Sequence, residues 1–218
     1  MGYGAVYDGM GPYRRGVGPV PASKQYQRMT RAPLRLISIT SALALVLSLL
    51  VVAPVAAETS IERAEKYAHS LLNCTRTGGW VKADGTCVGR GSGKYSAKRP
   101  ALRMHKKIGT RVARPFAKKL AIADVCGHSV AGVPGLATRM RQNGFRHYTY
   151  GENVGCGWGN GDPKATVLMT HRMMQAEKSS KGGHWKNMKN TRFKSVGIGV
   201  AKKNGRIMVV YDFYGKKY

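Results

Sequence analysis

Residues 196–214 read VGIGVAKKNGRIMVVYDFY, and this stretch decides the fold class. Two apolar segments, Val196 to Ala201 and Ile207 to Tyr214, flank the tripeptide Lys203-Asn204-Gly205. An Asn-Gly pair between two such segments is the strongest short signal for a β-hairpin. The end of the sequence is therefore predicted to form two antiparallel strands joined by a tight turn.

Two helices are predicted in front of this hairpin. The first spans Thr59 to Asn73, where Thr59 and Glu62 have the spacing of a capping box and apolar residues then recur at helical spacing. The second spans Leu102 to Ala123 with the same periodicity. Pro115 inside this run is expected to kink the helix or to mark a helix start near Arg111. Between the two helices, Val88 to Arg99 is expected to be a loop.

The middle of the chain mixes helix and strand signals. Gly135 to Asn143 is predicted to be a short basic helix, Tyr148 to Val154 alternates like a strand, and Asp162-Pro163 starts a helix that continues to about Ala176. The glycine-rich run GCGWGNG at 155–161 has neither the Lys-Ser/Thr of a phosphate loop nor the spacing of a dinucleotide fingerprint. The order of elements indicates an α+β fold with a small antiparallel sheet covered by helices.

Four cysteines follow residue 57, and none of them forms a CxxC pair; they are Cys74, Cys87, Cys126 and Cys156. An even number of cysteines in an exported chain favours disulfides over metal ligation or redox chemistry. Three pairings are possible. The pairing Cys74–Cys87 is favoured because a small polar segment lies between these residues, and Cys126–Cys156 follows by exclusion.

The first 57 residues resemble an export signal. Residues 1–35 are basic, contain a tract rich in Gly, Tyr and Pro, and are predicted to be a disordered tail, with Met29 as an alternative start. Residues 36–57 are uncharged and apolar and end in Val55-Ala56-Ala57, as a signal peptide does before cleavage. The alternative is an uncleaved membrane anchor, since the segment is about as long as the roughly 20 residues that span a bilayer. Residues 58–218 are then one secreted or membrane-anchored domain.

That domain is strongly cationic, with 31 lysines and arginines against 9 acidic residues, a net charge of about +22. Such a charge predicts nonspecific association with anionic polymers or lipids of the cell envelope. Specific nucleic-acid binding is not expected, because the basic residues are spread over every segment without an RNP-type aromatic pattern or zinc-finger spacing.

Four short motifs of the domain resemble those of the CAP superfamily, which contains cysteine-rich secretory proteins, antigen 5, pathogenesis-related proteins and the SCP-type domains of secreted bacterial proteins. The motifs are Leu72-Asn73 with Arg76, His128 within CGHSVAG, GENV at Gly151 to Val154, and Gly183-His184-Trp185 followed by Asn187 and FKSVGIGVA. The resemblance spans roughly Ile61 to Tyr214. It implies an α-β-α sandwich with a cleft lined by two histidines and two acidic residues.

Carried over by position, the resemblance places His128, His184 and Glu152 in this cleft. The second acid of the family lies on the helix before the Gly-His motif, where Glu177 is the only acid. An alternative for Glu177 is an exposed pair with Lys178 or Lys181. His171 stands where the family often has tryptophan, so it is either a core substitute for that ring or an additional polar group at the cleft.

The chemistry of these residue types allows two roles. Imidazole nitrogens and carboxylate oxygens are suitable ligands for Zn²⁺ or another divalent cation, so His128, Glu152, Glu177 and His184 are candidate metal ligands. They could equally form a hydrogen-bonded polar cluster that needs no metal. The predicted function is a binding module whose cleft accepts a metal, a small apolar ligand or a peptide.

An enzyme is the alternative, namely a metal-assisted hydrolase with Glu152 or Glu177 as general base. Neither an H-E-x-x-H nor a G-x-S-x-G signature is present, so the binding module is preferred. The remaining histidines, His69, His105 and His147, are expected to be solvated surface groups. Met173 and Met174 are expected to fill the core.

Overall fold

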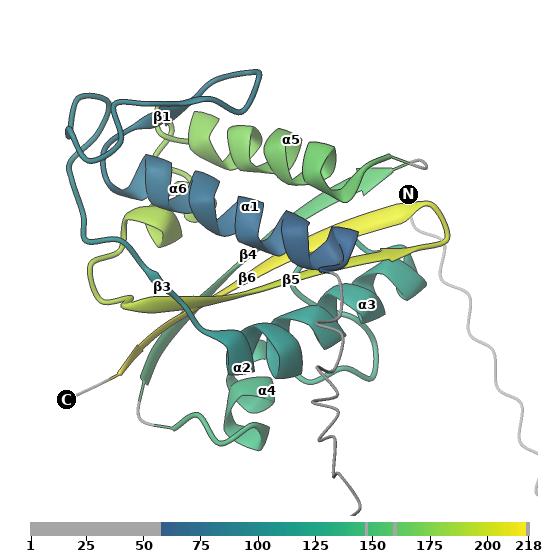
Figure 1. Ribbon diagram of the computed structural model, residues 1–218. Helices are drawn as coiled ribbons and strands as arrows, with labels where there is room; N and C mark the ends of the chain where they lie inside the picture. Colours follow the sequence, from purple (N-terminus) through teal and green to yellow (C-terminus); the bar gives the residue numbers. More distant parts are fainter. Residues whose placement is uncertain (1–57, 147, 159–160, 217–218) are drawn as a thin grey trace, which may run out of the picture. The chain divides into compact units, whose positions relative to one another are not determined.

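A computed structural model describes residues 58–146, 148–158 and 161–216 (Figure 1). The predicted tail at 1–35, the predicted signal or anchor at 36–57 and His147 lie outside the described residues. No helix within the described part of the chain is long and apolar enough to cross a bilayer.

A four-stranded sheet forms the centre of the domain, with the strand order β3-β5-β6-β4. β5 (Ser195–Lys203) and β6 (Arg206–Lys216) are antiparallel, as predicted, and the turn between them places Asn204 at φ 50° and Gly205 at φ 70°. Two successive residues with positive φ are the requirement that Asn-Gly meets. β4 (Tyr148–Trp158) pairs antiparallel with β6, whereas the short β3 (Arg103–Met104) pairs parallel with β5.

Helices cover both faces of this sheet, which confirms the predicted α-β-α sandwich. On one face, α1 (Ser60–Arg76), α5 (Pro163–Ala176) and α6 (Gly183–Lys189) share a core with β5 and β6. On the other face, α3 (Arg114–Ala123) packs on β4, β5 and β6 (Figure 1). α4 (Leu136–Gln142) follows α3 and leads into β4.

The second predicted helix starts later than expected and contains a π-helical turn. Residues 103 and 104 pair with β5, so the helical run begins with α2 (Lys106–Ile108). The π-helical segment η1 (Gly109–Ala113) then leads into α3, with Pro115 in its first turn. Proline has no N–H to continue the helical ladder, and the wider turn lies where that donor would otherwise be needed.

β4 extends to Trp158, so the prediction that the strand ends at Val154 was wrong. Gly155 and Gly157 belong to the strand because α5 lies directly on them. A Cβ atom on Gly155 would be 2.6 Å from Thr170 Cβ, and one on Gly157 would be 2.6 Å from Thr166 Cγ2. The glycine run therefore permits a close approach of helix and strand.

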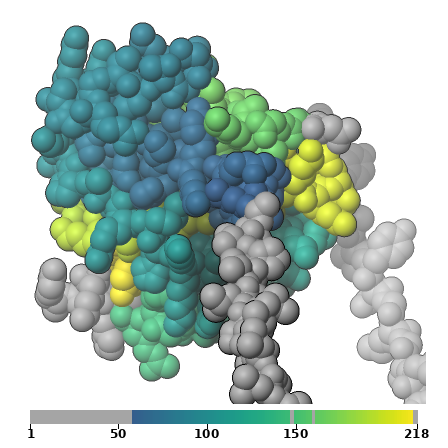
Figure 2. Space-filling view, in the orientation of Figure 1, coloured from purple at the N-terminus to yellow at the C-terminus, as the bar shows by residue number. Residues whose placement is uncertain are grey.

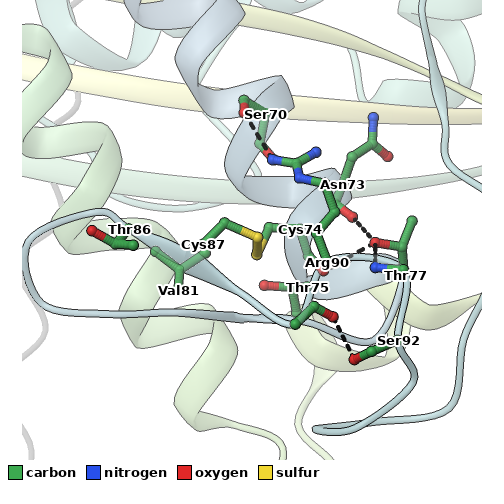
Figure 3. Close-up of a disulfide and its surroundings, with 12 residues drawn as sticks. Ser70, Asn73, Cys74, Thr75, Thr77, Val81, Thr86, Cys87, Arg90 and Ser92 are labelled. Carbon is green, nitrogen blue, oxygen red and sulfur yellow. Dashed lines mark hydrogen bonds between the residues drawn. A yellow bond between two sulfur atoms is a disulfide. The ribbon is translucent and has the colours of Figure 1, made fainter.

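Both favoured disulfides, Cys74–Cys87 and Cys126–Cys156, are present. Figure 3 shows Cys74 on α1 joined to Cys87. The polar segment between them contains β1 (Trp80–Val81), which pairs antiparallel with β2 (Cys87–Val88) as a small hairpin. The first disulfide fixes this hairpin to the end of α1.

Two residues of the first motif connect α1 to distant loops. Arg76 is buried, and its guanidinium donates to the carbonyl oxygens of four residues, which are Pro100, Met188, Asn190 and Phe193. Asn73 donates to the carbonyl of Leu102 and accepts from its N–H, at 3.0 and 2.8 Å. These contacts attach the 89–100 loop and the segment before β5 to the end of α1.

Candidate functional site

The first half of the candidate site is a carboxylate on β4. The side chain of Glu152 is only 6% exposed, and its Oε1 lies 2.9 Å from Nδ1 of His128, whose side chain is 57% exposed. The other oxygen, Oε2, accepts a hydrogen bond from Arg139 of α4. Glu152 therefore joins a buried arginine to an exposed histidine from the loop after α3.

The second half lies where α5 ends and α6 begins. Glu177 is the C-cap of α5, and its Oε1 lies 2.5 Å from Nδ1 of His184. The N–H of His184 donates to Oε2 of the same carboxylate at 3.0 Å. Burial raises the pKa of Glu177, but the hydrogen bonds and charge of His184 outweigh this effect and leave the pKa below its usual value. Glu177 is therefore paired with His184 and not with Lys178 or Lys181.

The two pairs lie close together. The ring centroids of His128 and His184 are 6.4 Å apart, with 32° between the ring planes. Two asparagines connect the pairs: Asn153 donates to the carbonyl of His184 at 3.1 Å, and Asn187 donates to Oδ1 of Asn153 at 2.9 Å. The structure thus brings all four predicted residues together from separate elements. Asn153 itself was not predicted as a site residue.

The positions of the four predicted metal ligands decide which of their atoms could reach a metal ion. The described residues contain no group of three or more His, Cys, Asp or Glu side chains placed to hold a metal ion. Each carboxylate instead faces a ring Nδ1, which leaves Nε2 of His128 and of His184 as the candidate ligand atoms. A histidine that ligates a metal through one nitrogen commonly donates its other N–H to a carboxylate. His128 and His184 are therefore candidate ligands with Glu152 and Glu177 as outer partners, and metal binding stays a prediction.

A third carboxylate, which the sequence motifs did not predict, lies behind Glu152. Asp212 of β6 is the register partner of Glu152 and is fully buried. Burial raises the pKa of Asp212 well above its usual value, and the negative charge of Glu152 raises it further, while Arg139 acts in the opposite direction. The raised pKa favours the protonated form of the Asp212 carboxyl.

A groove of about 730 Å³ leads away from His184 and Glu177 between β4 and α5. Its walls are mostly apolar and include Trp158, Met169 and Met173, which are 59%, 43% and 64% exposed. The prediction that Met173 fills the core was therefore wrong, whereas Met174 is buried as expected. A helical apolar spacing does not distinguish a residue that faces the core from one that faces a groove.

One wall of this groove is the outer edge of β4, which pairs with β6 on its other side only. The carbonyl of Glu152 accepts from Asn187 of α6, so it points away from β6. In an antiparallel ladder both main-chain groups of a residue point to the same side, and the direction repeats at every second residue. Val154, Cys156 and Trp158 therefore present their main-chain polar groups along the groove.

The other histidines have structural roles. His171 is completely buried beside Thr75, with 2.9 Å between Nε2 and Oγ1, and burial lowers its pKa to about 3, so it is a core residue. His69 donates to the carbonyl of Leu102 at 2.8 Å. His105 accepts from the N–H of Ile108 at 3.4 Å and packs against two aromatic rings. The expectation that His69 and His105 are solvated was wrong, because both fix loops to helices.

Comparison with known proteins agrees with this architecture. An extracellular protein containing an SCP domain from Bacillus anthracis str. Ames is similar over 72% of this chain and 41% of its own, with 17% sequence identity and a TM-score of 0.50. The described domain has the SCP, or CAP, fold. The fold implied by the motifs is thereby confirmed, and this chain spans about two fifths of the length of the Bacillus protein.

Two further structures of CAP type are similar at lower scores. A cysteine-rich secretory protein from Staphylococcus aureus covers 72% of this chain and 39% of its own, with 14% identity and a TM-score of 0.41. The CAP domain of enterococcal PrgA covers 71% of this chain and 61% of its own, with 18% identity and a TM-score of 0.42. No protein-family model and no curated protein sequence matches the chain.

Proposed function

We propose that this chain is an exported binding module of CAP type whose two histidine–glutamate pairs hold a divalent cation at the inner end of an apolar groove. The observation that carries the proposal is the placement of His128 and His184, with their rings 6.4 Å apart and Nδ1 of each held by a carboxylate. A bound cation would provide a positive centre at which a polar group of a ligand is held.

The groove determines which ligands suit such a module. Its apolar wall of methionine and tryptophan suits a small apolar molecule or the side chains of a peptide. The outer edge of β4 supplies main-chain donors and acceptors, which an extended peptide can pair with as an added strand. Neither ligand requires a catalytic group, and Glu152 is already engaged by Arg139 and His128.

Export and envelope association form the second part of the proposal. The apolar segment at 36–57 and the two disulfides both suit an oxidising, extracellular location. The similar Bacillus protein is described as extracellular. The net charge of about +22 on residues 58–218 then favours attachment to envelope polyanions.

Zinc titration by calorimetry tests the cleft. The oxidised full-length chain in a mild non-ionic detergent is expected to bind one Zn²⁺ with Kd on the order of micromolar, about −8 kcal/mol. The double substitution His128→Ala/His184→Ala should abolish the signal, and His69→Gln, which removes a histidine outside the cleft, should leave it unchanged. Absence of binding, or equal binding by the double variant, would overturn the metal proposal.

A further inference from the structure

Lysines and arginines are concentrated in two segments of the sequence that contain no acidic residue, although Arg114 and Arg206 pair with Glu65 and Asp124 outside these segments. Residues 85–123 contain eleven lysines and arginines and no acid, and residues 178–211 contain nine and no acid. The two segments meet at the 89–100 loop. Lys178, just after α5, donates to the carbonyl of Tyr95, and Lys189 of α6 donates to Oγ of Ser96 at 2.9 Å. Figure 2 shows residues 77–100 as a blue-to-teal lobe that projects beside α1.

Four side chains at this junction form what we call the cationic cluster: Lys94, Arg99, Lys178 and Lys189. Aromatic rings hold three of the ammonium groups in place. Lys94 lies 5.7 Å from the ring centre of Tyr95, Lys178 6.0 Å from that of Trp80, and Lys189 5.5 Å from that of Trp185. These contacts orient the charges without neutralising them.

Among the described residues, no acidic side chain forms an ion pair with a member of the cluster. Burial, followed by the cations Arg76, Arg99 and Lys178, lowers the pKa of Lys189 to about 8, with no carboxylate acting in the opposite direction. The nearest acid in the sequence, Glu177, is already paired with His184. A concentration of like charge without counter-charges produces a strong local positive potential, which attracts a polyanion.

We propose that the cationic cluster is the docking site for a poly(glycerol phosphate)-type polymer, a chain of phosphodiesters separated by a polyol. The proposal rests on the proposed function only in placing the protein outside the cell. The cluster offers point charges at separate positions, which suits repeated phosphates. The large apolar side chains at exposed positions of the described chain are Ile122, Tyr150, Trp158, Met169 and Met173, all outside 85–100 and 178–194. The rings of Trp80, Tyr95 and Trp185 beside the cluster are partly covered, so no fully exposed apolar side chain of the kind that inserts into a bilayer lies there among the described residues.

The test compares two double variants that lose the same charge. Lys94→Gln/Lys178→Gln removes two cations from the cluster, and Lys118→Gln/Lys119→Gln removes two exposed cations from α3, on the opposite face of the sheet. Binding of fluorescent poly(glycerol phosphate) to the oxidised full-length chain is measured by anisotropy over a range of salt concentrations. At about 0.1 M salt the cluster variant should bind at least about tenfold more weakly, with a smaller salt slope, and the α3 variant within about twofold of the parent.

Further measurements distinguish the proposed docking site from a packing effect, from attraction by net charge and from nucleic-acid binding. Lys94→Arg/Lys178→Arg keeps the charge and should keep the affinity, whereas a loss in this variant equal to that of the glutamine variant would assign the effect to packing and overturn the proposal. Equal losses in the cluster and α3 variants would show attraction by net charge alone, which overturns the docking site but leaves envelope association intact. No binding by the parent chain would overturn both, and the zinc titration would still report on the cleft. Tighter binding of a single-stranded DNA oligomer of equal charge would assign the cluster to nucleic acid.

Discussion

Glu177 holds His184 through two contacts, because one carboxylate oxygen lies 2.5 Å from Nδ1 of the ring and the other accepts the N–H of the same residue at 3.0 Å. The second contact fixes the start of α6, and the first fixes the orientation of the imidazole. A histidine held in this way keeps its rotamer and its tautomer before any ligand arrives.

The first prediction concerns this outer partner. Glu177→Gln keeps the size of the side chain but removes the charge that orients His184. Loss of such a partner typically lowers metal affinity about 10- to 100-fold. Zinc calorimetry on the variant should therefore show weakened but measurable binding. Unchanged affinity would mean that Glu177 has a purely structural role at the end of α5.

The second prediction concerns the buried acid behind Glu152. The folded-state pKa of Asp212 is raised, so its contribution to stability is fully present below the unfolded-state pKa and is lost as pH rises through the folded-state pKa. Asp212→Asn cannot ionise and avoids this loss. The variant should gain stability relative to the parent as pH rises above the ordinary pKa of an aspartate, about 4.

Urea unfolding at several pH values measures this difference. Asp84→Asn is the matched control, because Asp84 is exposed and its pKa is lowered, mainly by hydrogen bonds from Thr86. The stability that Asp84 contributes is present above its unfolded-state pKa and lost in acid. The difference between the control and the parent should therefore be constant from about pH 5 to 8 and should shrink only at lower pH. If the free energies of unfolding of Asp212→Asn and of the parent differ by the same amount at every pH, the raised pKa of Asp212 is contradicted.

The third prediction concerns the contact between β4 and α5. Gly157→Ala places a Cβ atom 2.6 Å from Cγ2 and 2.8 Å from Oγ1 of Thr166, and overpacking of this kind costs about 1–3 kcal/mol. Thr166→Ala in the same chain removes both atoms and should restore most of the loss. Gly161→Ala, with no described heavy atom within 4 Å of its Cβ, should change the free energy of unfolding by less than about 0.5 kcal/mol. If Gly157→Ala lowers the stability in thermal unfolding by the same amount with and without Thr166→Ala, the two positions are not in contact.

The same contact illustrates what the sequence could predict and what it could not. The β5–β6 hairpin depends on residues adjacent in the chain, so the Asn204-Gly205 pair was sufficient to predict it. The glycines of β4 lack strand propensity, and their role depends on Thr166 and Thr170 of α5. No local pattern contains that information, and the strand was therefore predicted four residues too short.

The residues of the candidate site also differ in whether the sequence alone could predict them. The motifs were sufficient to predict His128, Glu152 and His184, and the position of Glu177 followed from the end of its helix. In the sequence, Asp212 is a single polar residue within an apolar strand. Its position opposite Glu152 follows only from the register in which β4 pairs with β6. His69 was misread because its hydrogen-bond partner, the carbonyl of Leu102, belongs to a segment 33 residues away.

The last prediction separates the two disulfides by function. Each should contribute roughly 3 kcal/mol in the chain-entropy model, so removal of either by serine substitution should lower the melting temperature. Cys126–Cys156 also ties β4 to the loop that carries His128, two residues after Cys126. Cys126→Ser/Cys156→Ser should therefore weaken zinc binding as well, because His128 loses its fixed position opposite His184.

Cys74–Cys87 provides the matched control, since it joins α1 to the β1–β2 hairpin and no residue of the cleft lies in that hairpin. Cys74→Ser/Cys87→Ser should lower the melting temperature and leave zinc affinity within about twofold of the parent at a temperature where both variants are folded. If both pairs of substitutions weaken zinc binding equally, the cleft depends on overall stability. If neither does, His128 is positioned by Glu152 alone, and the second disulfide has no role in the site.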